Sequence, residues 1–257
     1  MQKNKLINNF SSISIIKHKQ KQIVNSLRDY IKENLPKKDE LLKLNNDEYR
    51  ELILSIQNNI NKKNFNKLII KNIYQNLVNY LDDDKILMQS HVYLRASRPV
   101  SSKIKAESES ISFHRESFYG SNLNNAINIW TPINGVNERN TLRFIPNSNL
   151  IKSKNIKTKK YKDKYTKKFS NGHKLGFQYT PLKILKGVNL KKNLPMIVPY
   201  YNSAVFSGKL IHGSAVNKSN TIRFSCDLRI LKKKDYKINK ENYHRVSNKP
   251  YFVEYKS

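Results

Sequence analysis

The chain has 257 residues, 38% of them hydrophobic, so it can bury a full core, and all-β barrels of this size commonly form one domain. Its single cysteine, Cys226, excludes an internal disulfide and lies among apolar residues, which predicts a buried thiol. The N-terminus lacks the apolar core of a signal peptide and no stretch approaches the roughly 20 apolar residues of a membrane span, so we expect a cytoplasmic protein.

The formal net charge of +30 would ordinarily indicate nucleic acid or another anionic partner. Lys, Asn and Ile are in excess along the whole chain, however, which is the pattern of an AT-rich genome. Aromatic residues do not alternate with basic ones as they do in a base-stacking sheet. We therefore do not expect nucleic acid to be the partner.

The first 85 residues are predicted to be helical, because apolar residues recur there at helical spacing in three sets. The first set ends before Pro36, and the second follows an expected cap at Asn46 or Asp47. The sets are Ile23, Leu27, Tyr30, Ile31 and Leu35; Tyr49, Leu52, Ile53, Ile56 and Ile60; and Phe65, Leu68, Ile69, Ile73, Leu77 and Tyr80. Each leaves a basic, solvated face, which favours helices that shield a sheet over helices that bind a partner.

From about residue 90 the pattern changes to short segments rich in β-branched and aromatic residues, separated by Asn, Gly, Pro and Ser. These segments lie at 91–100, 110–120, 125–133, 140–148, 202–214 and 221–231. So many short strands predict an antiparallel sandwich or barrel. We expect residues 86–257 to form a mainly β domain that the helical segment 1–85 covers.

A Lys-rich insertion at 152–174 interrupts the predicted strands. It carries nine Lys and one Asp between Lys152 and Lys168, a charge density that excludes a core element and predicts a surface loop or lid. Two interpretations stay open: a solvated insertion, or a clamp for a phosphorylated or carboxylated substrate. His173, inside the insertion, is predicted to be solvated.

His114 and Glu116 are two residues apart, so on a strand both side chains would point to one face. His212 could supply a third group from another strand. Two imidazoles and one carboxylate with open positions opposite form the facial triad that holds non-haem Fe(II). A lone His-x-Glu pattern arises easily by chance, so its weight depends on what accompanies it.

The accompanying feature is the segment 221–231, in which side chains alternate in character. One face carries Ile222, Phe224, Cys226 and Leu228, and the other Arg223, Ser225, Asp227 and Arg229. A core strand does not turn four polar groups inward without a ligand or partner for them. Arg223 can fork onto a carboxylate and Ser225 can add a hydroxyl donor, which predicts a receptor for the distal carboxylate of 2-oxoglutarate.

These residues together resemble the pattern of the Fe(II)/2-oxoglutarate oxygenases, specifically the phytanoyl-CoA dioxygenase-like branch, over about residues 90–232. The resemblance is carried by His114-Arg115-Glu116, Trp130, His212-Gly213-Ser214, Asn217, Ser219 and Arg223. It implies a double-stranded β-helix, a jelly-roll or cupin-like barrel, that holds iron through His114, Glu116 and His212. It also implies that Arg223 binds 2-oxoglutarate and that Ser214 and Trp130 line that pocket. Most members have Asp in place of Glu116, which is one methylene longer.

The same resemblance implies Fe(II), 2-oxoglutarate and O2 as cofactors, with ascorbate as a stimulant. Halogenating relatives replace the carboxylate by a small residue, so Glu116 indicates hydroxylation or another oxidation. The expected substrate is a small polar or anionic molecule, first of all a sugar, a nucleotide-sugar or a precursor of a cell-surface polysaccharide.

Two other functions stay open. A non-enzymatic basic jelly-roll module that binds anionic glycan or nucleic acid would need neither iron nor 2-oxoglutarate. A metal-dependent sugar isomerase of the cupin type would need the metal but neither Arg223 nor Ser225.

Several further residues keep two interpretations. His91, Arg95 and Arg98, on a predicted strand, either contact the substrate or form structural pairs. Tyr119 belongs either to the core or to the pocket. His18 and His244 carry no functional signal.

Overall fold

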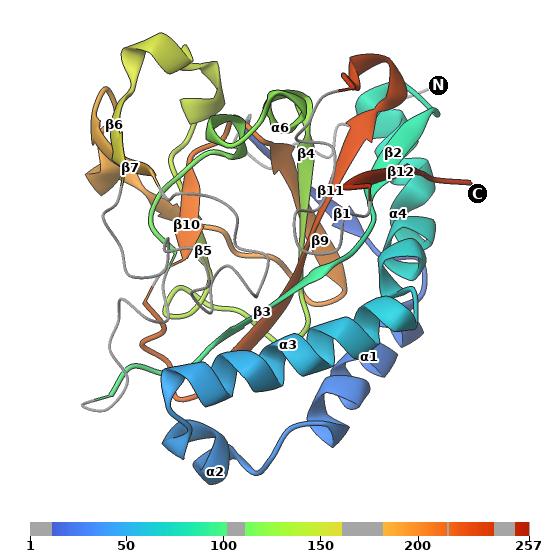
Figure 1. Cartoon of the computed structure of the whole chain (residues 1–257), viewed down its shortest axis with the longest axis vertical. Coiled ribbons are helices and arrows are strands. Elements are labelled where there is room, and N and C mark those ends of the chain that lie inside the picture. The colour runs from blue at the N-terminus through green and yellow to red at the C-terminus, as the bar shows by residue number, and fades with distance from the viewer. Residues whose placement is uncertain (1–11, 102–110, 161–181, 215, 239–249, 257) are drawn as a thin grey trace.

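The computed structural model describes residues 12–101, 111–160, 182–214, 216–238 and 250–256 (Figure 1). Two antiparallel sheets form the body of the protein, and helices lie along one side of the larger sheet while the smaller sheet lies on the other. This architecture confirms the mainly β, double-stranded β-helix fold with a helical cover. Of the helices in the described ranges, none is both long and apolar enough to span a bilayer.

The larger sheet has the strand order β1-β9-β4-β11-β2-β12, and β3 also pairs with β11. Its strands are β1 (Ile13–Lys17), β2 (Ile86–Gln89), β3 (Tyr93–Ser97), β4 (Ile127–Pro132), β9 (Asn202–Ser207), β11 (Arg223–Lys232) and β12 (Phe252–Glu254). All of its pairings are antiparallel. The strand β1 lies within the segment that the sequence pattern predicted to be helical.

The smaller sheet has the order β10-β5-β8 and faces the barrel interior from the opposite side. Its strands are β10 (His212–Ser214), β5 (Leu142–Phe144) and β8 (Leu194–Pro195), while β6 (Lys157–Lys160) and β7 (Leu182–Lys186) form a separate pair. The predicted strand 202–214 is therefore two strands in two sheets. The predicted strand 110–120 is wrong: only an isolated bridge joins His114 to His212, and a short 3-10 helix follows.

The helices are α1 (Lys21–Glu33), α2 (Lys38–Lys43), α3 (Asn46–Lys62), α4 (Phe65–Leu81) and the short α6 (Ser121–Asn125). The 3-10 helices are η1 (Glu116–Phe118), η2 (Ser148–Leu150), η3 (Ser153–Asn155), η5 (Leu190–Lys192) and η6 (Lys233–Asp235). The cap of α3 is Asn45, not Asn46 or Asp47, because the Asn45 side chain accepts from the N–H groups of Asp47 and Glu48 and Glu48 bonds back to Asn45. The helix α2 was not predicted.

Two of the apolar clusters of the core lie between the helices and the outer face of the larger sheet. Cys226 of β11 belongs to the cluster that α1, α3 and β3 build, and Leu228 and Ile230 belong to the cluster around α4. Cys226 is buried as predicted, and this burial raises the pKa of its thiol. The helices therefore shield the sheet through the apolar face of β11.

The Lys-rich insertion is described only in part. Lys157–Lys160 pair with β7, and Ile156 and Ile184 anchor this strand pair in a small apolar cluster. Residues 161–174, with His173, lie outside the described residues, as does His244, so the choice between clamp and solvated insertion stays open.

His18 links the edge of the larger sheet to α4 through buried hydrogen bonds. The amide of Asn72 donates to its Nδ1 (2.9 Å), so its Nε2 carries the hydrogen and donates to Ser203 (2.8 Å). The orientation of the Asn72 amide is fixed, because the same Nδ2 also donates to the carbonyl of Gln20. Burial lowers the pKa of His18 to about 4, so the imidazole is neutral at pH 7.

This pKa predicts a pH-dependent stability. Between pH 6.5 and about 4 the unfolded chain binds a proton at His18 that the folded protein does not, so stability falls on acidification by about 3 kcal/mol. Urea unfolding of His18→Gln should show lower stability at pH 7 and a flatter decline over that window than the wild type. Curves that stay parallel between the two proteins over this window would contradict the assignment.

Candidate metal and carboxylate site

Two histidines meet in the barrel because their backbones pair directly. The N–H of His114 donates to the carbonyl of His212 (2.9 Å) and the N–H of His212 donates back (3.0 Å), which places their ring centroids 4.6 Å apart. Each Nδ1 lies beside a carbonyl oxygen, that of Ser112 at 2.8 Å and that of Leu210 at 3.0 Å. A carbonyl only accepts, so each Nδ1 carries the hydrogen and each Nε2 keeps its lone pair for a metal.

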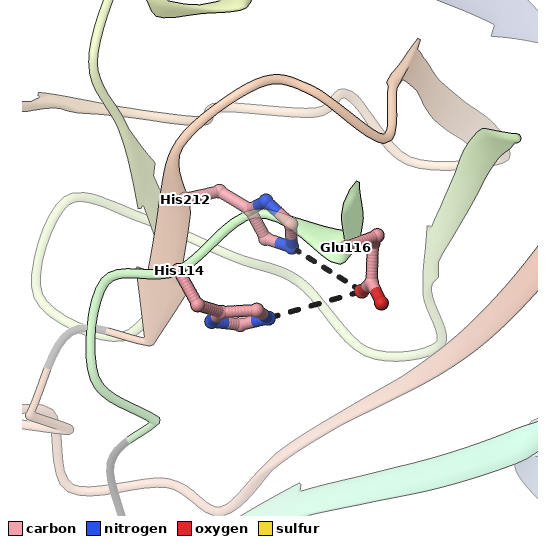
Figure 2. A group of neighbouring side chains, drawn as sticks. All are labelled: His114, Glu116 and His212. Carbon is pink, nitrogen blue, oxygen red and sulfur yellow. Dashed lines mark ion pairs between the residues drawn. The ribbon is translucent and has the colours of Figure 1, made fainter. Parts of the chain in front are cut away.

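Glu116 completes the group from a 3-10 turn instead of the strand that the sequence pattern predicted. Its Oε1 lies 3.8 Å from Nε2 of His114 and 3.9 Å from Nε2 of His212 (Figure 2). One ligand atom from each of the three residues lies within 4.8 Å of the others, so they could hold a metal ion. The N–H of Ser117 donates to the carbonyl of Gly208, which ties this turn to the segment that follows β9.

The charges in this group suit a cation. Burial acts to raise the pKa of Glu116, but the Arg229 guanidinium holds it well below its usual range. Burial lowers the pKa of His212 to about 3, and the neighbouring His114 acts in the same direction. At neutral pH the group therefore presents one carboxylate and a neutral His212 imidazole, the protonation states that metal binding requires.

A second constellation lies on the inner face of β11. Nε and Nη1 of Arg223, Oγ of Ser225 and Nε1 of Trp130 are buried, and none has a hydrogen-bond partner among the described residues. The guanidinium carbon of Arg223 lies 6.0 Å from the centroid of the Trp130 ring, so these groups are neighbours. Burial lowers the pKa of Arg223 to about 10, which still leaves it charged at pH 7. Buried N–H and O–H donors beside a guanidinium have the chemistry that fits a carboxylate.

The other arginines that the sequence singled out form pairs within the protein. Arg95 donates to the carboxylate of Asp227 at 2.9 Å, across the β3–β11 pairing. Arg98 lies over the Tyr49 ring at 4.0 Å and donates to the carbonyl of Leu44, so it joins the barrel to the helices. For both residues a structural pair is present, as one of the two interpretations expected.

The remaining candidates divide between scaffold and site. His91 meets the ring edges of Tyr93 and Tyr251, with centroids 4.7 and 5.9 Å away. Tyr119 packs in an apolar cluster and also places its ring centroid 5.9 Å from that of His114, so it belongs to both the core and the site. Burial raises its pKa to about 12.

The residues between His212 and Arg223 mainly form hydrogen bonds that hold the loop before β11. The amide of Asn217 donates to the carbonyls of Ser97 and Thr221, and its oxygen accepts from Ser219, which fixes the loop that leads into β11. Ser214 ends β10, and its N–H donates to the carbonyl of Ile111. The role of Ser214 in lining the 2-oxoglutarate pocket stays a prediction.

Arg229 is the functional residue that sequence reasoning placed on the correct face but gave no role. Its Nη2 donates to Oε1 of Glu116 at 2.6 Å, and the pair is buried. The sequence did contain a signal for Arg229: it lies six residues after Arg223 on the same strand, so both side chains point to the same face.

Gly208 lets the chain lie close to the turn at Glu116, because a Cβ there would lie 2.5 Å from the carbonyl oxygen of Leu123 and 3.4 Å from the Cβ of Glu116. Gly208→Ala is therefore expected to lose about 1–3 kcal/mol of stability and to move Glu116 away from the histidines. Gly135→Ala is the matched control, because its Cβ would meet only the Tyr200 ring at an ordinary 3.5 Å. Denaturant unfolding and metal titration of both variants check this, and equal results for the two would contradict it.

Comparisons with known proteins were made for the whole chain. A family model described as phytanoyl-CoA dioxygenase matches residues 37–225, and no curated protein sequence matches. Among solved structures, the non-heme monooxygenase ThoJ in its apo form has a TM-score of 0.54 at 12% identity over 86% of this chain and 74% of its own. The epimerase SnoN, in complex with Fe3+, alpha ketoglutarate and nogalamycin RO, has a TM-score of 0.51 at 12% identity over 87% and 80%. EvdO2 from Micromonospora carbonacea var. aurantiaca has 0.50 at 11% over 85% of each chain. At such identities these structures are similar to this chain in fold.

Proposed function

This chain belongs to the phytanoyl-CoA dioxygenase family and is a 2-oxoglutarate-dependent non-haem iron enzyme, and from that membership we propose that it hydroxylates a small polar molecule. We assign iron binding to His114, Glu116 and His212 and binding of the distal 2-oxoglutarate carboxylate to Arg223. The observation that carries the proposal is the presence of a convergent His-Glu-His group together with a buried arginine whose Nε and Nη1 have no hydrogen-bond partner among the described residues.

The three iron ligands follow from donor chemistry. Both imidazoles present Nε2 to Oε1 of Glu116, and two nitrogens with one carboxylate oxygen on one side of an ion leave the opposite positions open. His114 is half-buried and the other two residues are buried, so a metal held by them would be largely shielded from solvent. That arrangement suits a site at which a cosubstrate and O2 have to bind as well.

The 2-oxoglutarate site follows from the unpartnered donors. Arg223 would hold the distal carboxylate through its planar fork, Ser225 would donate its hydroxyl to the same group, and Trp130 would form a wall with its N–H directed to the ligand. These groups would fix the cosubstrate in one orientation and exclude water from it. A sugar isomerase would leave Arg223 buried without an anion, which disfavours that alternative.

The chemistry is that of the bound cofactors: iron and 2-oxoglutarate together activate O2, with oxidation of a C–H bond of the substrate and release of succinate and CO2. The protein contributes the other requirements. Arg229 keeps Glu116 charged, Arg223 would orient the cosubstrate, and the buried walls of the barrel would exclude competing water.

For the substrate we keep a sugar, a nucleotide-sugar or a polysaccharide precursor as the first candidates. Support comes from the inner face of β11, where Oδ1 of Asp227 is buried without a partner among the described residues while Oδ2 pairs with Arg95. A free acceptor beside a paired cation suits a ligand that carries hydroxyl groups. Cytoplasmic location stays a prediction from the sequence.

The metal assignment predicts loss of binding in two variants. His114→Ala and His212→Ala should each lower the affinity for Fe(II) or Co(II) below detection in an anaerobic titration. Each substitution removes one of the three ligands, and the two that remain are too few to hold the ion. His18→Gln is the control, since His18 is a buried histidine bonded to Ser203 and Asn72 on the other face of the sheet. Wild-type affinity in both alanine variants would refute the site.

The cosubstrate assignment predicts a loss of 2-oxoglutarate affinity. A buried carboxylate that loses its charged partner is weakened by about 2–5 kcal/mol, so Arg223→Leu should raise the dissociation constant at least about 30-fold. Calorimetry on metal-loaded protein measures this, with the exposed Arg139→Leu as control. Arg223→Leu with the affinity of the wild type would show that the carboxylate binds elsewhere.

A further inference from the structure

We propose that Arg229 is a positioning residue of the metal site, which aims the Glu116 carboxylate at the two histidines and is itself held in place by Gln89 and Tyr251. The proposal rests on the proposed role of Glu116 as an iron ligand. It assigns a function to a cation that lies within the barrel and binds neither the metal nor, by our assignment, 2-oxoglutarate.

The contact between Arg229 and Glu116 fixes the relevant oxygen. Nη2 of Arg229 donates at 2.6 Å to Oε1 of Glu116, the same oxygen that lies 3.8 and 3.9 Å from the Nε2 atoms of His114 and His212. Arg229 is 5% and Glu116 3% exposed, so water does not compete for this bond. The hydrogen bond therefore decides where the ligand oxygen points before any metal binds.

Arg229 is anchored on its other side by neutral groups. Its Nη1 donates to Oε1 of Gln89 at 3.2 Å and to the hydroxyl of Tyr251 at 3.0 Å. Gln89 ends β2 and is fully buried, and Tyr251 precedes β12. One nitrogen thus binds the scaffold and the other binds the ligand carboxylate, a division that the planar guanidinium permits and a lysine ammonium does not.

The length of Glu116 fits this arrangement. Its carboxylate has to reach both Arg229 and the space between two histidines from the first residue of a 3-10 turn. Aspartate, one methylene shorter, would bring the oxygen short of one or the other. The pairing with Arg229 thus gives a physical reason for the longer acid at this position.

Two effects of Arg229 on a metal ion oppose each other. Its charge repels a cation bound to the same oxygen, so a purely electrostatic role predicts that removal of the guanidinium tightens metal binding. A positioning role predicts the reverse, because a buried carboxylate without its partner leaves the aligned orientation and has to be brought back when the metal binds. The sign of the change in affinity therefore separates the two.

The test is titration of metal-free protein with Co(II), without 2-oxoglutarate, in the wild type and in Arg229→Met. We expect the dissociation constant to rise about 10- to 100-fold, as for other partners of metal ligands, and the Co(II) absorption spectrum to change. Arg229→Lys should recover only part of the affinity. Glu116→Asp, which keeps the carboxylate but shortens it, should also bind Co(II) more weakly than the wild type.

A second, milder substitution keeps the test valid if Arg229→Met does not fold. Tyr251→Phe removes one hydroxyl from the anchor and should weaken Co(II) binding about 2- to 10-fold, the effect of one hydrogen bond. Lys233→Met is the matched control, because it removes an exposed ion pair, with Glu254 at 2.8 Å, just beyond the same strand. It should leave the affinity unchanged.

The outcomes distinguish this inference from the proposed function. If the wild type does not bind Co(II), or if both His114→Ala and His212→Ala bind it as well as the wild type, the proposed metal site fails. If the wild type binds and Arg229→Met or Tyr251→Phe binds equally well or more tightly, with an unchanged spectrum, the site stands and the positioning role of Arg229 is overturned.

Discussion

Strand β11 has to satisfy two environments at once, and the site depends on this constraint. Its apolar side chains, among them Cys226 and Leu228, pack under the helices, while Arg223, Ser225 and Arg229 face the barrel interior. A shift of one residue in the pairing of β11 with β4 would place guanidinium groups in the apolar core. The helices therefore do more than cover the sheet, because their packing fixes the register that turns the arginines toward the site.

The two inward arginines differ in how their charge is compensated. Arg229 is compensated within the protein by Glu116, whereas Arg223 has buried N–H groups without a partner among the described residues. A buried cation without a partner lowers the stability of the ligand-free protein, and an anionic ligand restores it. The difference agrees with the roles proposed above, in which Arg229 orients Glu116 of the protein itself and Arg223 binds a ligand from solution.

Much of this arrangement could be predicted from sequence, because it depends on local periodicity. The alternation from Ile222 to Arg229 and the three long amphipathic helices were readable in this way. The convergence of His114, Glu116 and His212 was predicted as well, although through a strand at Glu116 that does not exist.

What could not be predicted depends on contacts between distant parts of the chain. The turn at Glu116 requires the carbonyl of Gly208, and the partner of its carboxylate is Arg229. Neither contact produces a periodic pattern in the amino-acid sequence near residue 116. For the same reason His18, without a functional signal in sequence, proves to be a buried link between β1 and α4 whose partners Ser203 and Asn72 are far away along the chain.

The edge strand β1 has a consequence for the order in which the chain can fold. Ile13 pairs with Phe206 and Lys17 with Asn202, so β1 is synthesised long before β9, the strand with which it pairs. The helices that follow β1 form from contacts close in sequence and need no such delay. Closure of this sheet edge is thus a late, long-range step, and until then the apolar side chains of Ile13 and Ile16 remain open to other partners in the nascent chain's surroundings.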